Sequence, residues 1–127
     1  MYRLWRCVAV VFMVAALAQD PAKVDPEHVK MEFENEFVRV LRIRLGPHEK
    51  IPMHEHSAHV VVSLTETDVM TTLANGKTAA MRMRAGEARW APPLSHAAEN
   101  LHDTPIELIE IELKGSAHGE SSEQPPL

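Results

Sequence analysis

Three histidines in two short segments of the chain have the spacing of a metal site. His54 and His56 are two residues apart, and residues i and i+2 of an extended strand leave the same face, so both imidazoles can point at one spot. His96 lies about forty residues further on and can complete the cluster from a distant strand. Three imidazoles that converge in a sheet-lined cavity predict a site for one divalent transition metal.

The segments around these histidines alternate between apolar and charged residues, which indicates half-buried strands. The apolar members are expected to face the interior: Leu41, Ile43 and Leu45; Met81 and Met83; Ile109, Ile111 and Leu113. Asn75-Gly76 between two alternating runs predicts a two-residue hairpin. No amphipathic helix and no internal repeat is evident. Such strands avoid long exposed edges in closed or double-sheet architectures, so the predicted fold is all-β, a single antiparallel barrel or jelly roll.

The composition divides the chain into four parts. Residues 1–18 carry Arg3 and Arg6, an apolar run and a small-x-small ending at Ala16-Leu17-Ala18, the pattern of a secretory signal peptide. Residues 19–28 are rich in Asp, Pro and Glu and are expected to form an extended N-terminal arm. The barrel domain is expected over 29–114, and the polar segment 115–127 is expected to be a disordered tail.

The leader sets the expected location of the protein. Its apolar run, from Cys7 to Ala18, is shorter than the roughly 20 residues of a membrane-spanning helix, so no stable membrane anchor is expected. A secreted or periplasmic protein is predicted, cleaved near Ala18. Cys7 is the only cysteine, so the mature chain has no disulfide.

Nucleic acid is excluded as a partner by the charge. The formal net charge is -5, and removing Arg3 and Arg6 with the leader takes it to -7. A chain this acidic binds phosphate backbones poorly. The arginines of the barrel segments alternate with apolar residues and are expected on solvated strand faces: Arg39, Arg42, Arg44, Arg82, Arg84 and Arg89.

The histidine segments resemble the two motifs of the cupin family. The first family motif is Gly, five residues, His-x-His, three or four residues, Glu, six residues, Gly, and His54 and His56 match its histidine pair. The second is Gly, five residues, Pro-x-Gly, two residues, His, three residues, Asn, and it is matched by Gly86, Pro92, His96 and Asn100. The resemblance covers most of residues 36–114 and implies a cupin β-barrel.

The chain also departs from the family pattern. His48 stands at the position of the first glycine, and the glutamate that binds metal in many cupins would fall at Val60 or Val61. His59 is the candidate fourth ligand in its place. If the strand continues without interruption from His56, His59 points away from the site, and this is the expected arrangement. A bulge at Ser57-Ala58 would turn it inward.

Two further residues are expected near the cavity. In a regular strand Trp90 shares a face with His96 and would form a wall of the cavity, with core packing as the alternative. Asn100 closes the second motif and is also expected at the cavity, the alternative being a residue that stabilises a turn.

The resemblance implies three classes of function. The first is a metal-dependent oxygenase or isomerase with Fe, Mn, Ni, Zn or Cu as the metal, acting on a small, anionic organic ligand. The second is a binding module for metal or a small ligand without turnover, and the third is a metal-free structural barrel. The resemblance also implies a homodimer formed by strand exchange, with residues 19–28 as the candidate exchanged element.

We predict that the exported protein begins near Gln19, because Ala16 and Ala18 are small side chains at the positions that signal peptidase requires. Intact mass spectrometry of the exported protein would show the loss of residues 1–18. A product that retains Met1 and stays in the membrane would contradict both the cleavage and the location.

Overall fold

The alternating segments form nine β-strands and one helical turn in the computed structural model, which describes residues 19–115. The helical turn is α1 (Pro21–Val24). The strands are β1 (Val29–Glu34), β2 (Val38–Leu45), β3 (Lys50–His56), β4 (His59–Ser63), β5 (Thr67–Leu73), β6 (Thr78–Met83), β7 (Ala88–Ala91), β8 (Leu94–Asn100) and β9 (Ile106–Leu113). The signal peptide predicted at 1–18 and the tail from residue 116 lie outside the described residues.

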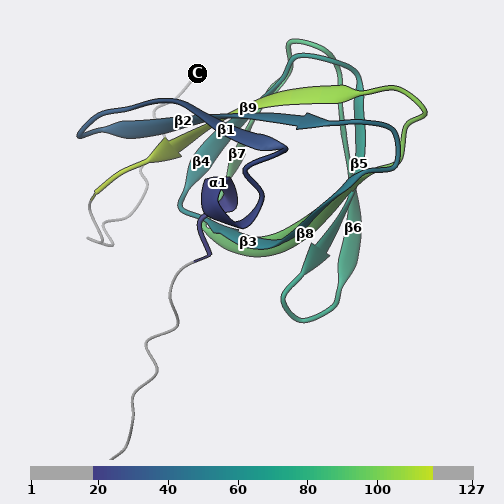
Figure 1. Cartoon of the computed structure of the whole chain (residues 1–127), viewed down its shortest axis with the longest axis horizontal. Helices are drawn as coiled ribbons and strands as arrows, with labels where there is room; N and C mark the ends of the chain where they lie inside the picture. Colours follow the sequence, from purple (N-terminus) through teal and green to yellow (C-terminus); the bar gives the residue numbers. More distant parts are fainter. Residues whose placement is uncertain (1–18, 116–127) are drawn as a thin grey trace, which may run out of the picture.

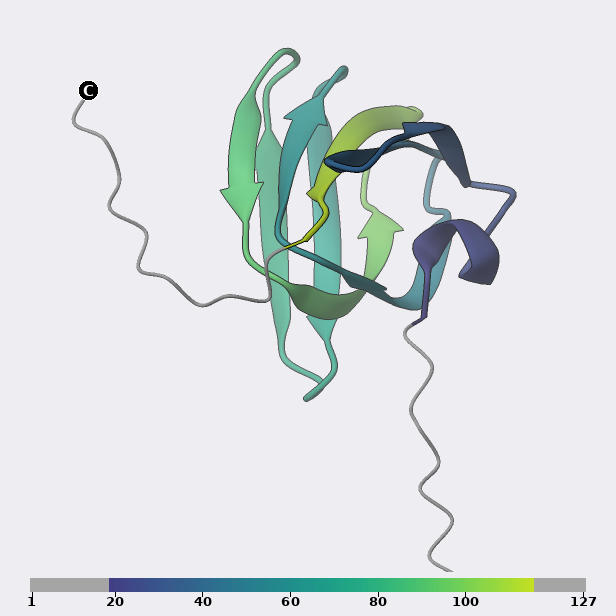
Figure 2. The ribbon, with the colours of Figure 1, turned by 90° about the vertical axis from the view of Figure 1, so that its left-hand side faces the viewer.

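The strands form two facing antiparallel sheets (Figure 1). The first sheet has the order β1-β2-β9-β4-β7, and the second has the order β3-β8-β5-β6. Figure 2 shows how the two sheets curve around a common interior. The predicted all-β class and the antiparallel jelly-roll barrel are therefore confirmed. Within residues 19–115 there is no helix of the length and apolarity needed to cross a membrane.

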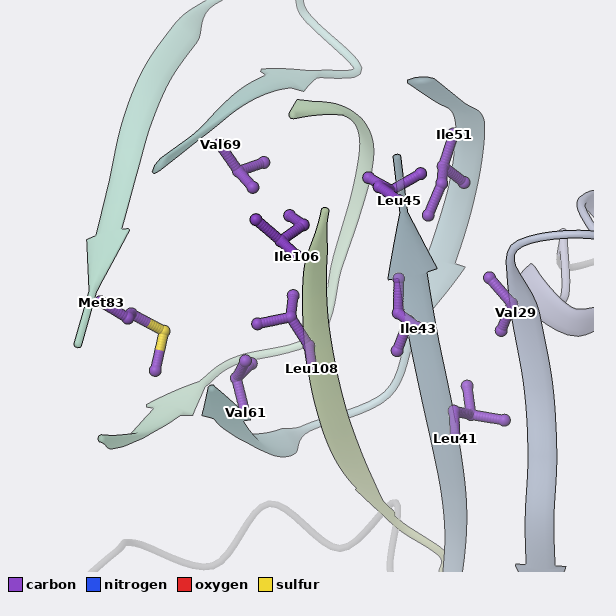
Figure 3. Packing of buried hydrophobic residues seen from close by; sticks show 10 residues of the cluster. All are labelled: Val29, Leu41, Ile43, Leu45, Ile51, Val61, Val69, Met83, Ile106 and Leu108. Carbon is purple, nitrogen blue, oxygen red and sulfur yellow. The ribbon is translucent and has the colours of Figure 1, made fainter. Parts of the chain in front are cut away.

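The apolar core lies between the two sheets (Figure 3). As predicted, Leu41, Ile43 and Leu45 of β2 face inward and are buried, and so is Met83 of β6. They pack with Val29, Ile51, Val61, Val69, Ile106 and Leu108, which come from both sheets. Leu41 and Leu45 are almost completely buried, so truncating either to alanine should cost about 2–5 kcal/mol.

Strand β9 has the opposite orientation to the predicted one. Its buried positions are Ile106, Leu108, Glu110 and Glu112, while Ile109 and Ile111 lie on the outer face. The register with β2 explains this, because Leu41 pairs with Glu110 and Ile43 pairs with Leu108. The outer face of this sheet is apolar as well, where Val40, Ile111 and Val60 stand in one row. Alternation along β9 therefore does not reveal which face is covered.

The N-terminal arm is folded against its own barrel, not extended as predicted. The Asp20 side chain caps the helical turn α1 by accepting a hydrogen bond from the Ala22 backbone N–H at 3.0 Å, and Pro21 is buried. The Glu55 backbone N–H donates to the Gln19 carbonyl at 2.8 Å. As a result α1 packs against β1 and β3, which are edge strands of different sheets, and closes that side of the barrel (Figure 1).

Two turns show where the backbone needs unusual conformations. The predicted hairpin at Asn75-Gly76 is present, but β5 ends at Leu73 and β6 begins at Thr78, so its loop is longer than two residues. Only Gly76 has a positive φ there, +83°. Between β2 and β3, His48 has φ +59°, the left-handed region that favours glycine. The missing glycine of the first motif therefore corresponds to a real conformational demand.

We predict that His48→Gly is more stable than His48→Val by about 1–2 kcal/mol, because glycine adopts a positive φ freely and a β-branched residue does not. Both variants lose the exposed contact of His48 with Asp103 at 2.7 Å, so this loss cancels in the comparison. Urea unfolding at neutral pH measures the difference. Equal midpoints would mean that the turn relaxes to another conformation.

Candidate metal centre

Strands β3 and β8 bring the three predicted histidines together. His54 and His56 lie two residues apart on the inner face of β3, and His54 pairs directly across the strands with His96 of β8. The ring centroid of His54 is 4.6 Å from that of His56 and 4.7 Å from that of His96. One nitrogen of each ring lies within 4.8 Å of one nitrogen of both others. The three imidazoles thus surround a common point.

His59 also faces the interior, so the expectation that it points outward is wrong. Only 2% of its surface is exposed, and its ring centroid lies 4.8 Å from that of His56. The physical reason is the change of sheet: β3 ends at His56, and β4 begins at His59 in the opposite sheet. Ser57 and Ala58 make this crossing, and the alternation starts anew after them. His59 forms a second group of potential metal ligands with His56 and Glu110.

The hydrogen bonds of three rings leave the same nitrogen free. Nδ1 of His54 lies 2.8 Å from the Pro52 carbonyl oxygen, and Nδ1 of His59 lies 2.8 Å from the Ser57 carbonyl oxygen. A carbonyl oxygen only accepts, so each Nδ1 is the donor and each Nε2 is the nitrogen left to face a metal. Nδ1 of His56 is in the same way 2.7 Å from Oε1 of Glu112.

The Nε2 atom of His56 provides a direct test of whether a metal fits. It is buried and has no hydrogen-bond partner in the described part of the chain. A buried nitrogen without a partner costs free energy, and metal coordination would satisfy it. Imidazoles whose second nitrogen donates to a carbonyl or carboxylate are the usual form of histidine ligands. The residues present therefore fit a metal ion.

The protonation states of His54 and His96 also favour metal binding. Burial lowers the pKa of His54 to about 4. Burial, together with repulsion from the neighbouring imidazoles, lowers the pKa of His96 to about 3. Both rings are therefore neutral at pH 7, and a neutral imidazole is the form that binds metal.

His56 differs because it faces two carboxylates. Burial by itself would lower its pKa, but the hydrogen bond to Glu112 and the negative charges of Glu110 and Glu112 outweigh burial and raise it. Burial acts to raise the pKa of Glu112, while its contacts with His56 and Arg39 hold it below the usual range. Glu112 is therefore ionised and holds the His56 ring by a charge-assisted hydrogen bond.

Glu110 and Glu112 were not predicted as site residues, because the sequence pattern of their strand favoured an outward orientation for them. Val61, where the family glutamate was sought, is buried and apolar, and the carboxylates come instead from β9. Both glutamates lie on the same face of the strand as Ile106 and Leu108, because the four positions are two residues apart. Assigning Ile106 and Leu108 to the core would have placed the glutamates inside. Oε2 of Glu110 is buried, 3.2 Å from Nδ1 of His56, and has no hydrogen-bond partner in the described residues.

Arg39 is not on a solvated face, as had been expected, but completes a chain of charges. Its side chain is 15% exposed, and its Nε donates to Oε2 of Glu112 at 2.9 Å. Its Nη1 and Nη2 donate to the two carboxylate oxygens of Asp20 at 2.7 and 2.9 Å. Asp20, Arg39, Glu112 and His56 therefore connect the N-terminal arm with the histidine cluster.

The predictions for Trp90 and Asn100 are wrong. Trp90 is 60% exposed on the outer face of β7, because β7 ends at Ala91 and β8 starts in the other sheet. Asn100 is fully buried, but it lies away from the cavity lining. Its amide nitrogen donates to the Gly46 and Thr104 carbonyl oxygens at 2.9 Å, and its oxygen accepts from the His102 N–H. Asn100 therefore stabilises turns, which was the alternative considered.

Comparison with known proteins yields matches among solved structures alone. No family model matches the chain, and no curated protein matches it. A cupin domain from Bordetella pertussis is 27% identical, with a TM-score of 0.64 over 68% of this chain and 92% of that one. A protein with a double-stranded β-helix domain from Klebsiella pneumoniae is 18% identical, with a TM-score of 0.55 over 72% and 81% of the two chains.

An enzyme is also among the similar structures. The E162A mutant of Bacillus subtilis oxalate decarboxylase is 20% identical, with a TM-score of 0.50. The match covers 61% of this chain and 22% of the decarboxylase. At this identity the likeness concerns the fold.

The contact between Glu112 and His56 leads to a testable prediction. Glu112→Gln should weaken binding of Ni²⁺ or Zn²⁺ by about 10- to 100-fold, because a neutral amide holds the His56 ring less firmly. Competition with a chromogenic chelator measures the affinity. Glu107→Gln is the matched control, since Glu107 lies on the same strand but pairs with Arg42 and Arg44 away from the histidines. Equal affinities of the Glu112 variant and the wild type would exclude this role.

Proposed function

Because this chain is a small single-domain protein with the cupin fold, we propose that it binds one divalent transition metal through His54, His56 and His96, with His59 as a fourth ligand. The observation that carries the proposal is the buried, unpartnered Nε2 of His56 at the centre of the cluster. The hydrogen bonds that turn Nε2 of His54 and His59 away from the backbone support it.

The donor set narrows the choice of metal. Four imidazole ligands suit Fe, Ni, Cu and Zn better than they suit Mn, which prefers oxygen ligands. The carboxylates of Glu110 and Glu112 stand next to His56 and balance the charge of a cation without being needed as ligands. When bound, the metal supplies Lewis-acid or redox chemistry to a small ligand in the cavity.

The chain's own residues prepare the site for that role. Glu112 fixes the His56 ring, the Pro52 and Ser57 carbonyls fix two others, and burial keeps His54 and His96 unprotonated. The cavity beside the cluster has a volume of about 270 Å³, which is enough for a small organic molecule. This arrangement supports a metal-dependent enzyme, an oxygenase or an isomerase.

A binding module without turnover is the second candidate. In the described residues Glu110 is the one carboxylate that lines the cavity and has a free oxygen, so few groups could move protons. The third reading, a metal-free structural barrel, is disfavoured because it would leave Nε2 of His56 buried without a partner.

The cellular setting is part of the same proposal. The leader pattern of residues 1–18 supports a secreted or periplasmic protein. A homodimer stays a prediction. The arm that was considered for exchange packs on its own barrel through Gln19 and Asp20.

We predict that purified protein binds close to one equivalent of metal, measured by elemental analysis after dialysis. His54→Ala, His56→Ala and His96→Ala should each lose most of it, because each removes one ligand from a small set. His102→Ala is the control, since His102 lies in the turn after β8 and outside the cluster. Equal metal content in all four variants would refute the site.

His59 provides a separate test. The sequence led to the expectation that His59→Gln would be nearly silent, and its inward position reverses that expectation. The substitution should weaken metal binding at least tenfold, equivalent to about 1.4 kcal/mol. Chelator competition against wild type measures the change. An unaltered affinity would leave a three-histidine site.

A further inference from the structure

The cavity beside the histidines is closed on one side of the barrel and open on the other. The closed side lies between β1 and β3, where α1 covers the gap and Pro21 lines the cavity floor. The other edges of the two sheets are β7 and β6. The exposed lining residues gather there: Leu73 at the end of β5, Ala79 and Ala80 on β6, and Arg89 on β7. The mouth therefore lies between β6 and β7.

The wall between this mouth and the histidines is almost entirely apolar. Valine, leucine, isoleucine, methionine and alanine side chains from both sheets form it. Apart from the four imidazoles, the polar side chains that line it are Thr71, Arg89 and Glu110. A ligand with many hydroxyl groups would leave most of them without partners here, which costs binding free energy.

Arg89 does not offer a free positive charge at the mouth. Its Nε donates to Oε1 of Glu87 at 2.7 Å, and its Nη2 donates to the Arg82 carbonyl oxygen at 2.6 Å. The Glu87 carboxylate balances its charge, so an anionic group of a ligand gains less attraction there. The place for a negatively charged end is therefore the histidine cluster, where a bound cation would carry the charge.

We propose that the ligand of this cavity is a small molecule with one oxygen-donor end, a carboxylate or an enolate, and an apolar body. The oxygen end binds at the metal, and the apolar body fills the space between the histidines and the mouth. This inference rests on the proposed metal site. It favours short aliphatic or aromatic acids over sugar acids and other polyhydroxy compounds.

Two acids of equal carbon number, hexanoate and gluconate, test the ligand class on metal-loaded wild-type protein, with acetate as the short reference. Isothermal titration compares these three carboxylates, which differ only in the chain attached to the carboxyl group. Hexanoate should bind at least tenfold more tightly than acetate, since each buried methylene contributes up to about fourfold, equivalent to about 0.8 kcal/mol. Gluconate should bind no more tightly than acetate. Hexanoate no tighter than acetate, gluconate tighter than hexanoate, or no binding of any of them overturns the proposal.

A substitution at the mouth of the cavity tests where hexanoate binds. Ala79 is exposed and stands opposite Thr71 on the cavity side of β6, so Ala79→Trp should obstruct the mouth. It should reduce hexanoate affinity at least tenfold and change metal affinity less than twofold. Ala88→Trp is the matched control, because Ala88 is exposed on β7, the other edge strand, and lies outside the cavity lining. Equal hexanoate affinity in both variants would place the ligand elsewhere.

The two proposals fail in different ways. If the wild-type protein takes up no metal, the proposed function is wrong, and the proposed ligand class, which depends on the metal, is wrong with it. If it takes up metal but shows no preference for hexanoate, the metal site stands and the proposed ligand class is wrong.

Discussion

The hydrogen bond between Nδ1 of His56 and Glu112 connects the two sheets at the level of the candidate metal site. His56 belongs to β3 of one sheet and Glu112 to β9 of the other, and both are almost completely buried. A buried carboxylate requires partners, and Glu112 has His56 and Arg39. Arg39 in turn pairs with Asp20 of the arm. Removing one member leaves the others uncompensated, so the fold and the site depend on the same contacts.

The interior changes in character along the central strand β9. Ile106 and Leu108 contribute to the apolar core, and Glu110 and Glu112 follow on the same face beside the histidines. The inner face of this strand therefore provides burial of apolar surface at Ile106 and Leu108 and the polar groups beside the site at Glu110 and Glu112. A chain of this size without a disulfide has a small core, so polar groups in the interior have to be mutually satisfied. The ion pairs of Glu112 meet this requirement, whereas Nε2 of His56 and Oε2 of Glu110 are buried without a partner in the described residues.

The departures from the cupin motifs have physical explanations in the structure. His48 occupies a glycine position and has a positive φ, so the turn keeps its shape at a conformational cost. The motif glutamate is absent, and Val61 faces the core. His59 instead contributes an inward imidazole from the start of β4, and Glu110 and Glu112 bring carboxylates to the same region from β9. The carboxylates therefore come from β9, which pairs with β4, the strand on which the motif would place its glutamate.

Local patterns in the sequence were sufficient for the strands, the hairpin at Gly76 and the triad. The two-residue period determines that His54 and His56 share a face wherever their strand packs, and the second motif placed His96 opposite them. The tertiary structure decided everything that depends on which face is covered. His59 and Trp90 changed sides because the chain crosses between sheets next to each of them, after His56 and after Ala91, and the alternation restarts there.

Glu110 and Glu112 lie inside for a different reason. Both faces of β9 carry apolar residues, so local alternation is compatible with either orientation, and only the register with β2 and β4 selects one. Asn100 has the spacing of the second motif, but its amide donates to Thr104 in the turn that follows β8 and to Gly46 in a turn that is distant in the chain. The sequence by itself thus determined the local period and the spacing of the histidines. Only the packing of two sheets decided which side chains meet them, because burial depends on partners that are distant in the chain.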